Sequence, residues 1–305
     1  MNMNEPTLFA AQGLRGELSF DVPMSRHTSW RAGGAAQRLY RPADLADLQD
    51  FLGQVPAQEP LFAVGLGSNL LVRDGGLRGT VLLLHGALSE LRMDGEMIYA
   101  QAGVAGAKLA RFAASNNLCG AEFFAGIPGT LGGMLAMNAG CYGSETWQKV
   151  QRVQVLTRRG ELLERTPQEY EIGYRHVAQR AVNEEFFVGA WLHFEQGDAE
   201  AARQEIKALM EKRSASQPLQ LPNAGSVFRN PPGGHAAKLI EDCGLKGKRI
   251  GGAQVSEKHA NFIVNAGEAT AADIENLIEE VRATVAAKTG VALHPEVRIV
   301  GEKSK

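Results

Sequence analysis

The sequence predicts an α+β fold in which both halves of the chain mix helices and strands. Short apolar or β-prone runs bounded by glycine and aspartate recur in the first half, and the amphipathic helical patterns become longer in the second half. The 35 glycines gather in clusters with bulky apolar residues between them, so they are not linkers. Such clusters indicate places where the backbone passes close to another group. The 305 residues are enough for about two or three domains.

The first half of the chain contains mainly strands. We expect strands over residues 61–64, 81–84, 97–100, 150–157, 161–165 and 186–194, and one helix over residues 105–117. In that helix Leu109, Phe112 and Ala113 lie on one face at helical spacing. The two strands on either side of Arg159-Gly160 are expected to form a hairpin.

The second half carries the longer helices. Asp198 is a candidate N-cap for an amphipathic helix that begins at residue 199, and Thr270 is a candidate N-cap for a helix that Gly290 ends. We also expect a short helix over residues 235–244 and strands over residues 249–255, 261–264 and 297–300. No internal repeat is present.

The composition excludes several classes of partner. Hydrophobic residues make up 44% and charged residues 22% of the chain, which is ordinary for a globular protein. The net charge of -2 provides no electrostatic basis for binding nucleic acid or an acidic membrane. No apolar run is long enough to span a bilayer, and Glu5 and Pro6 stand where a secretory signal needs basic and then apolar residues. We therefore expect a cytoplasmic protein.

Cysteine usage agrees with a reducing compartment. The three cysteines, Cys119, Cys141 and Cys243, are an odd number without a CxxC spacing, so we expect neither a disulfide framework nor a metal site. None has a histidine partner by motif, which disfavours a catalytic cysteine.

The run that follows residues 61–64 is the first candidate cofactor loop. Gly65, Gly67, Ser68 and Asn69 follow an apolar strand, but the third glycine and long helix of a dinucleotide fingerprint are absent. In place of a helix N-terminus, a turn rich in glycine can point several consecutive backbone N–H groups at a diphosphate. Serine and asparagine side chains can act as further donors. The alternative is a plain β-turn loop.

A second glycine-rich loop strengthens the cofactor hypothesis. The segment "GIPGTLGG" at residues 126–133 is followed by "MNAGCYG", and this region is too rich in glycine for one regular element throughout. Two such loops could clamp one extended dinucleotide from two sides; the alternative is a glycine-rich packing junction. The candidate cofactor residues of this region are Gly126, Pro128, Gly129, Thr130, Gly133 and Gly140.

Six motifs together resemble one family. The chain contains, in order, "GLGSNLLV", "GIPGTLGGMLAMNAGCYG", "YEIGYR", "NAGSVFRNP", "AAKLIEDCGLKG" and "GGAQVSEKHANFIVN". In this order they resemble the UDP-N-acetylenolpyruvoylglucosamine reductase family, over nearly the whole chain from "HTSWRAGG" to "HPEVRIVGE". The chain is similar to the shorter class of that family, which lacks an extra loop with a substrate-binding tyrosine.

The resemblance implies a fold and a domain division. The implied fold is an FAD-binding fold of the vanillyl-alcohol-oxidase (PCMH) type in two subdomains, followed by a C-terminal α+β substrate-binding domain. We expect the subdomains at residues 1–80 and 81–197 and the substrate-binding domain at residues 198–305, with the strand at about 294–301 returning to the active site. The glycine loops then fall where the family holds the FAD diphosphate and ribityl chain.

The resemblance also implies a reaction. NADPH reduces non-covalently bound FAD, and the reduced flavin delivers hydride to the vinyl carbon of UDP-N-acetylglucosamine enolpyruvate, giving UDP-N-acetylmuramate for peptidoglycan synthesis. Negative charge develops next to the substrate carboxylate, so the site needs a cation, an acid and a proton donor. No second dinucleotide motif is present, which agrees with NADPH and the UDP-sugar using one site in turn.

Three residues match the catalytic positions of the family. Arg175 in "GYRHV" would grip the carboxylate, Ser226 in "NAGSVFRNP" would protonate the carbanion, and Glu296 in "HPEVRIV" would act as a protonated donor with a raised pKa. From the residues alone, a surface arginine, a turn serine and a solvated glutamate remain the alternatives. For the substrate we expect Asn230 as a contact and Lys238 and His259 as weaker candidates for the UDP diphosphate.

The residues leave two other functions open. One is an FAD-linked oxidase of the same fold, for which only His27 and Cys141 lie near the motifs as sites of covalent flavin attachment. The other is a catalytically inactive nucleotide-sugar binder. We further expect a monomer whose partners are the UDP-sugar substrate and NADPH.

Overall fold

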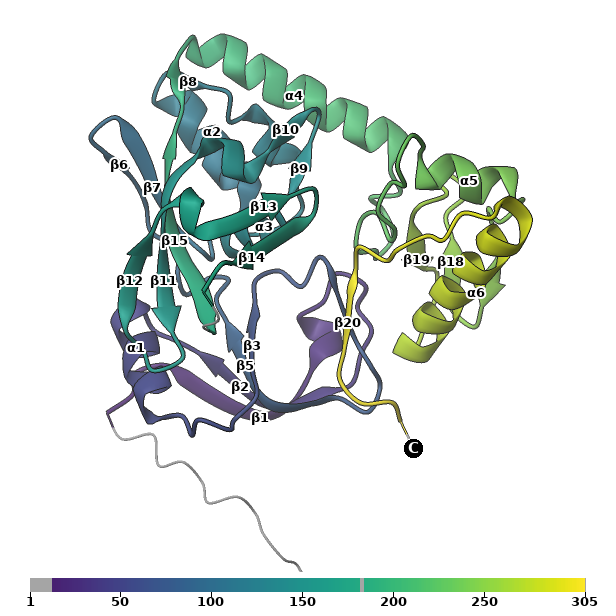
Figure 1. Ribbon diagram of the computed structural model, residues 1–305, viewed down its shortest axis with the longest axis horizontal. Coiled ribbons are helices and arrows are strands. Elements are labelled where there is room, and N and C mark those ends of the chain that lie inside the picture. The colour runs from purple at the N-terminus through teal and green to yellow at the C-terminus, as the bar shows by residue number, and fades with distance from the viewer. Residues whose placement is uncertain (1–12, 182–183, 305) are drawn as a thin grey trace, which may run out of the picture.

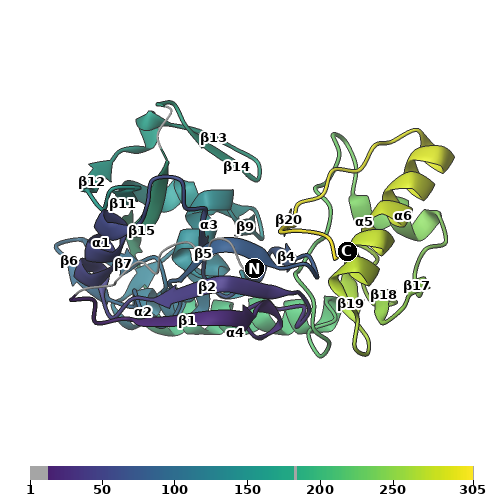
Figure 2. The same cartoon turned by 90° about the horizontal axis from the view of Figure 1, so that it is seen from below.

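The structure is a computed structural model that describes residues 13–181 and 184–304. Two sheets with their helices form a larger lobe, and the last third of the chain forms a smaller α+β lobe beside it (Figure 1). Seen from below, the short strands β4 and β20 lie between the two lobes (Figure 2). The predicted α+β fold class is confirmed.

The first sheet has the strand order β1-β2-β5-β3. Its strands are β1 (Glu17–Pro23), β2 (Ala35–Arg41), β3 (Leu61–Val64) and β5 (Leu77–Leu83), and α1 (Leu45–Gln54) packs on it. The Asp44 side chain caps α1 by accepting from the Asp47 N–H, and Phe51 of α1 stacks on Tyr40. The sequence prediction missed β1, β2 and α1, whereas the strand at residues 61–64 is confirmed.

The second sheet is antiparallel throughout, with the order β12-β11-β15-β7-β6. Its strands are β6 (Leu91–Asp94), β7 (Met97–Gln101), β11 (Val150–Thr157), β12 (Leu162–Arg165) and β15 (Glu185–His193). The helices α2 (Gly106–Ser115) and α3 (Leu131–Met137) bury their apolar residues against this sheet. The predicted strands, the helix at 105–117 and the hairpin at Arg159-Gly160 are confirmed.

Shorter elements complete the larger lobe. The strands β13 (Tyr170–Gly173) and β14 (His176–Gln179) form a hairpin that the sequence prediction missed. The other short strands are β8 (Leu118–Cys119), β9 (Gly140–Cys141), β10 (Ser144–Glu145) and β16 (Glu195–Gln196). Single turns of 3₁₀ helix lie at Met24–Arg26, Glu122–Gly126, Thr146–Lys149 and Pro167–Glu169.

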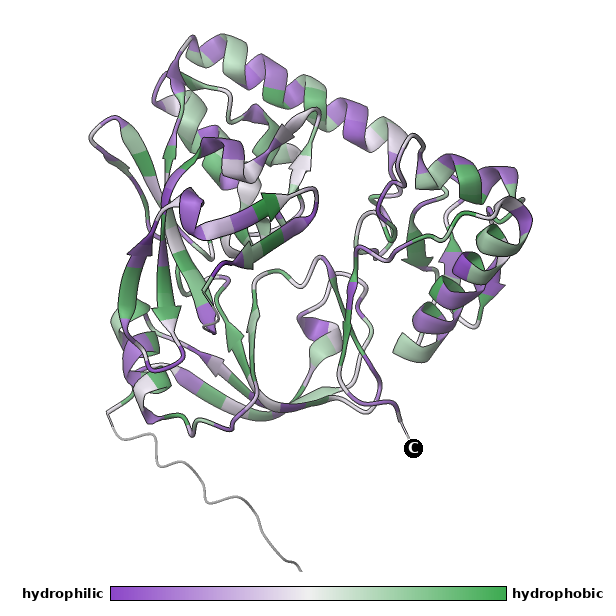
Figure 3. Cartoon of the chain, viewed as in Figure 1, coloured by the Kyte–Doolittle hydropathy of each residue, from purple (hydrophilic) through white to green (hydrophobic). Residues whose placement is uncertain are grey.

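Helix α4 (Ala199–Ser216) runs from the larger lobe toward the smaller one (Figure 1). The Asp198 side chain accepts from the Ala201 N–H at 2.6 Å, so the predicted N-cap is confirmed. Hydrophilic residues alternate with apolar ones along this helix (Figure 3), and Ile206 and Met210 pack against the core of the larger lobe. The substrate-binding domain at residues 198–305 remains a prediction. It would include α4, although this helix packs against the core of the larger lobe.

The smaller lobe consists of two helices around a small sheet. Its elements are α5 (Ala236–Asp242), β17 (Arg249–Ile250), β18 (Ala253–Val255), β19 (Ile263–Asn265) and α6 (Ala271–Thr289). The predicted single strand at residues 249–255 is wrong, because Gly251, with φ 51°, and Gly252 form a turn that splits it into β17 and β18. The predicted end of α6 at Gly290 is confirmed by its left-handed conformation, with φ 75°.

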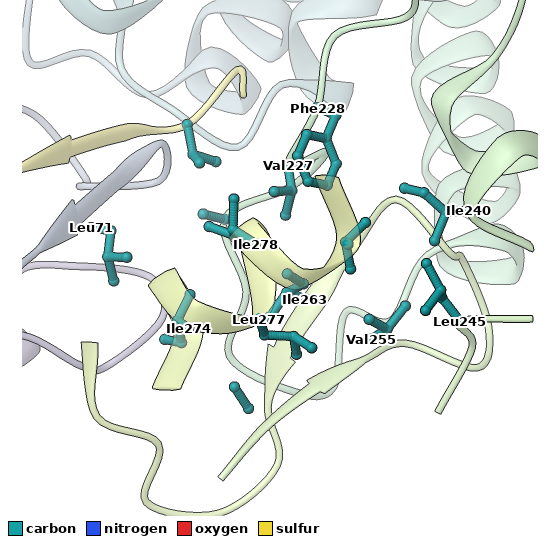
Figure 4. Close-up of a cluster of buried hydrophobic side chains, with 14 of the residues drawn as sticks. Leu71, Val227, Phe228, Ile240, Leu245, Val255, Ile263, Ile274, Leu277 and Ile278 are labelled. Atoms are coloured by element: carbon teal, nitrogen blue, oxygen red, sulfur yellow. The ribbon is translucent and has the colours of Figure 1, made fainter. Parts of the chain in front are cut away.

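The core of the smaller lobe extends into the larger one. Residues of α6 such as Ile274 and Leu277 pack with Val227, Phe228 and residues of the small sheet (Figure 4). Leu71 of β4 (Leu70–Val72), which precedes this lobe by some 150 residues of chain, belongs to the same buried cluster (Figure 4). Burial of this shared apolar surface holds the two lobes together.

Two further contacts join the lobes. The last strand, β20 (Arg298–Val300), pairs in parallel with β4, which confirms the strand predicted at residues 297–300. The Asp74 carboxylate accepts from the N–H groups of Ala271 and Ala272 at 2.9 and 2.8 Å, so a residue of the larger lobe caps α6. The predicted boundary between residues 80 and 81 falls inside β5, and the three-part division stays a prediction.

The N-cap of α6 allows a test of stability. Thr270 and Asp273 exchange hydrogen bonds of 3.0 Å in a capping box. Replacing Thr270 with alanine is expected to lower the free energy of unfolding by about 1 kcal/mol, because one N–H of the first turn loses its acceptor. Thermal or urea unfolding would measure the loss. Thr270→Ser keeps the hydroxyl and is the control; equal stability of the alanine and serine variants would contradict the prediction.

Candidate active site

A cavity of about 710 Å³ lies where the glycine loops meet the smaller lobe. All ten residues predicted to hold the cofactor line it: Gly65, Gly67, Ser68, Asn69, Gly126, Pro128, Gly129, Thr130, Gly133 and Gly140. Arg175, Ser226 and Glu296 line it as well, although they come from three distant segments. The structure thus brings together the predicted cofactor loops and all three predicted catalytic residues.

The first glycine loop connects β3 directly to β4, with no helix between them. Gly67 has φ 60°, and a Cβ there would overlap the carbonyl oxygen of His27, so only glycine suits this position. Within the described part of the chain, the N–H groups of Leu66 and Ser68 donate to no protein acceptor. Backbone donors left free on the wall of a cavity are what an anionic ligand such as a diphosphate requires.

The second loop lies directly against the first. A Cβ on Gly65 would overlap the hydroxyl oxygen of Thr130, which shows how close the two loops approach. Gly133, in the first turn of α3, has nothing within 4 Å of the position that a Cβ would take, and the residue lines the cavity. The cavity space beside Gly133 is therefore kept open by the missing side chain. This open cradle, together with the free N–H groups, fits an extended dinucleotide such as FAD.

Arg175 and Glu296 form an ion pair on the cavity wall. Arg175 Nε donates to Glu296 Oε1 at 2.7 Å, and both side chains are 16% exposed. Burial raises the pKa of the Glu296 carboxyl above its usual value, although the charges of Arg175 and Arg229 act to lower it. A carboxyl whose pKa is raised in this way can keep its proton when the carboxylate of a ligand comes close.

Ser226 lies beside this pair because its segment runs next to that of Glu296. Phe228 forms an antiparallel bridge with Pro295, and the Glu296 N–H donates to the Val227 carbonyl at 2.7 Å. Gly225, with φ 74°, turns the chain just before the serine. Ser226 lines the cavity and its hydroxyl makes no hydrogen bond to any described residue, so it is free to donate to a ligand.

The three predicted substrate residues lie outside the cavity lining. Asn230 Oδ1 accepts from the Ala236 N–H at 3.1 Å at the start of α5, and exposed Lys238 pairs with Asp242 at 2.5 Å. His259 packs against Phe262, and burial lowers its pKa. Phe262 itself reaches the cavity, so His259 stands behind its wall. Their roles in substrate binding stay predictions.

The sequence prediction did not single out several polar residues of this region. Arg213 and Arg298 also line the cavity, and burial lowers the pKa of Arg213. Asn69, which was predicted as a cofactor residue, also has a contact that was not predicted: its side chain donates to the backbone carbonyl of Glu296 at 3.1 Å, which links the first glycine loop to the acid. Asn138 was also missed, and its backbone carbonyl accepts from Arg175. The signal that could have found it is its place in "MNAG", because an asparagine directly after a helical run is typical of a helix that ends in a left-handed residue.

Cys141, considered above for covalent flavin attachment, also lines the cavity. Burial raises the pKa of its thiol to about 11, and its sulfur donates to the Phe123 carbonyl at 3.1 Å. A thiol that keeps its proton is a poor nucleophile, which disfavours attachment of flavin through this residue.

Comparison with known proteins identifies the class of protein. Residues 36–166 match a family model described as an FAD binding domain, and residues 217–300 match the C-terminal domain of UDP-N-acetylenolpyruvoylglucosamine reductase. A chain with this FAD-binding domain and a cavity lined by both glycine loops is an FAD-dependent oxidoreductase.

Relatives along the whole chain define the family. The chain is 59% identical over 304 residues to a UDP-N-acetylenolpyruvoylglucosamine reductase of Thiobacillus denitrificans, with 95% of this chain and 94% of the relative covered. It is 60% identical over 287 residues to one of Alkalilimnicola ehrlichii, covering 94% and 96%. The crystal structure of the Thermus caldophilus reductase matches with a TM-score of 0.80 at 30% identity, covering 94% and 99%. The chain belongs to the UDP-N-acetylenolpyruvoylglucosamine reductase family.

The family assignment confirms the main predictions from sequence. The protein is an FAD-dependent reductase of peptidoglycan precursor synthesis, with the FAD-binding fold of the vanillyl-alcohol-oxidase type that the resemblance implied. Among the described residues, no helix has the length and apolar character needed to cross a bilayer. In the same part of the chain, no three metal-binding side chains gather into a site.

Proposed function

We propose that this protein reduces UDP-N-acetylglucosamine enolpyruvate to UDP-N-acetylmuramate, with NADPH as hydride donor, and that Arg175, Ser226 and Glu296 perform the steps that the protein contributes. The main support for the proposal is that these three residues, which come from separate segments, line one cavity together with both glycine loops. When bound, FAD supplies the two-electron chemistry, accepting hydride from NADPH and delivering it to the enolpyruvyl group.

Arg175 binds the substrate carboxylate in this proposal. A guanidinium stays charged at any working pH and can donate two parallel hydrogen bonds to a carboxylate. The Glu296 carboxylate lies at that place in the structure, 2.7 Å from Arg175 Nε. The substrate carboxylate would exchange with Glu296, and the charge that develops next to it would be stabilised by the same guanidinium.

Glu296 and Ser226 have different roles as donors to the substrate: Glu296 donates a hydrogen bond, and Ser226 supplies the single proton of the reaction. A substrate carboxylate adds negative charge beside Glu296, which further favours the protonated carboxyl as a hydrogen-bond donor. Ser226 donates its hydroxyl proton to the carbon next to the carboxylate. A serine hydroxyl is a weak acid, but a carbanion is a strong base, so the position of the hydroxyl decides the rate.

The UDP end of the substrate has two sets of candidates. Arg213 and Arg298 bring positive charge to the cavity, which suits a diphosphate. Asn230, Lys238 and His259 stay the residues that the family resemblance indicates, and they lie outside the cavity lining. We further propose that the protein is a monomer that acts in the cytoplasm.

Absorbance of the bound flavin tests the proposed function. Anaerobic addition of NADPH should bleach the flavin band, and subsequent addition of UDP-N-acetylglucosamine enolpyruvate should restore it. Bleaching without recovery would refute the proposed substrate. Acid precipitation distinguishes an FAD-linked oxidase with covalent flavin, because flavin that stays in the pellet would argue against non-covalent FAD.

The open space at Gly133 gives a prediction about the cofactor. Gly133→Val should lower FAD affinity by about 10- to 100-fold, because the new side chain would take up space in the cavity and overpacking costs about 1–3 kcal/mol. The apoprotein should lose no more stability than a protein with valine at another exposed helical glycine, since a Cβ at this position meets no protein atom. The flavin-to-protein absorbance ratio after dialysis and the fluorescence of released FAD would measure the loss.

Gly53→Val in α1 is the matched control for this variant. Gly53 is also a helical glycine with room for a Cβ, whose nearest neighbour would be the Arg159 carbonyl at 3.8 Å, but it lies outside the cavity lining. The Gly53→Val protein should bind FAD normally. Full flavin content in Gly133→Val would show that the cofactor lies elsewhere.

A further inference from the structure

Asn138 is a buried asparagine whose side chain bonds through both of its polar atoms. It is 1% exposed, and its Nδ2 donates to Glu145 Oε2 at 2.8 Å and to the Gly173 carbonyl at 3.1 Å. Its Oδ1 accepts from the Trp147 N–H at 3.1 Å. Two acceptors on one side and a donor on the other fix which way the amide faces.

The hydrogen bond to Gly173 connects two parts of the site. Gly173 is the last residue of β13 and stands two residues before Arg175. Arg175 has φ 53°, a left-handed conformation that costs free energy in a residue other than glycine, so the turn depends on support from its surroundings. The Asn138 side chain supplies part of that support from the turn that follows α3.

The same turn also holds the guanidinium of Arg175. The carbonyl oxygens of Asn138 and Gly140 accept from Arg175 Nη1 and Nη2 at 3.4 and 2.8 Å. Arg175 Nε is left to face Glu296. The turn after α3 therefore fixes the hairpin through the Asn138 amide and fixes the guanidinium through two backbone carbonyls.

We infer that Asn138 is a positioning residue for the reaction, because its side-chain amide ties the hairpin to the turn that aims Arg175 at the substrate carboxylate. This inference rests on the role proposed above for Arg175. The amide itself touches neither the cavity nor the carboxyl of Glu296, so it acts only through the arginine.

Backbone conformation and side-chain bonding can be separated at this position. Asn138 has φ 42° and ψ 50°, a left-handed conformation that asparagine tolerates and glycine adopts at no cost. Asn138→Gly therefore keeps the turn and its carbonyl but removes the amide. If Asn138 only ended helix α3, glycine would replace it without loss.

The test measures the two half-reactions of the holoenzyme by stopped flow, with UDP-N-acetylglucosamine enolpyruvate as the oxidant. Asn138→Gly should slow reoxidation by the substrate about 10- to 100-fold, since a displacement of about 1 Å can cost that much. Reduction of the flavin by NADPH should stay within about twofold of wild type, and the Kd of the substrate, measured by calorimetry on the oxidised enzyme, should rise.

A double variant separates positioning from general destabilisation. Asn138→Gly in an Arg175→Met background should slow reoxidation no further than Arg175→Met alone, because the amide acts through the arginine. Thr146→Val is the matched control: it removes a partly buried 2.7 Å hydrogen bond from the Thr146 hydroxyl to the Ala139 carbonyl in the same turn, a bond that does not involve the hairpin. It should leave both half-reactions unchanged.

The possible results are distinguishable. Losses that multiply in the double variant, a normal rate in Asn138→Gly, or an equal loss in Thr146→Val would each overturn the positioning role while leaving the role of Arg175 intact. A normal rate of reoxidation in Arg175→Met would overturn the proposed role of the arginine, and the inference about Asn138 with it. Flavin content and circular dichroism confirm that each variant is folded.

Discussion

Replacing Ser226 with alanine is expected to slow reoxidation of the NADPH-reduced enzyme by UDP-N-acetylglucosamine enolpyruvate by about 10²- to 10⁴-fold, the range typical of a positioned proton donor. Ser226 lines the cavity and its hydroxyl makes no hydrogen bond to the described residues, so its loss leaves no buried partner unsatisfied. Reduction of the flavin by NADPH should stay near normal, because that half-reaction needs no proton from the serine. Stopped-flow absorbance at the flavin band measures both rates.

The control for Ser226 is a serine whose loss should change neither rate. The Ser216 hydroxyl, at the end of α4, donates to the Lys212 carbonyl at 2.9 Å and is exposed. Ser216→Ala should therefore behave as wild type. An equal loss in both half-reactions of Ser226→Ala would show that this serine is not the proton donor but supports flavin binding or the fold.

Replacing Glu296 with alanine is expected to slow the same half-reaction by about 10²- to 10³-fold, as for the removal of one donor that stabilises developing charge. Glu296→Gln keeps a hydrogen-bond donor and should lose less. Neither variant should bind the substrate much more weakly, because the substrate carboxylate can take the place of Glu296 on Arg175.

The pH dependence of reoxidation supplies the second readout for Glu296. Burial raises its pKa, so the carboxyl keeps its proton to a higher pH than an exposed glutamate. The protonated form is present below this pKa and is lost as the pH rises through it, so the wild-type rate should fall on the alkaline side. Glu296→Gln cannot ionise, and its profile should lack this fall; a wild-type profile in the Gln variant would contradict the assignment.

Part of the fold could be predicted because its signals are local. The caps at Asp198 and Thr270 and the strands at residues 61–64 and 150–157 follow from residue type and short-range periodicity. Helix α1 was missed although its Leu48 and Phe51 repeat at helical spacing after a capping aspartate. Strands such as β2 need partners from elsewhere in the chain, and pairing with distant strands leaves little trace in a single sequence.

The catalytic residues could be predicted only through the family motifs. Arg175 and Glu296 are 121 residues apart, and nothing in their local sequence shows that they form an ion pair. The hairpin that carries Arg175 was missed because the residue with φ 53° is an arginine, where turn chemistry would favour glycine or asparagine. Asn138 was overlooked because its bonds reach Gly173, which lies 35 residues away.

The pairing of β20 with β4 has a consequence for folding. β4 begins directly after the first glycine loop, and its neighbour β20 comes from a distant part of the chain. Contacts between residues far apart in sequence require a long loop of chain to close before they form. The loop that cradles the diphosphate therefore gains its neighbouring strand only when the two lobes meet, and a folding intermediate with undocked lobes would carry an incomplete flavin site.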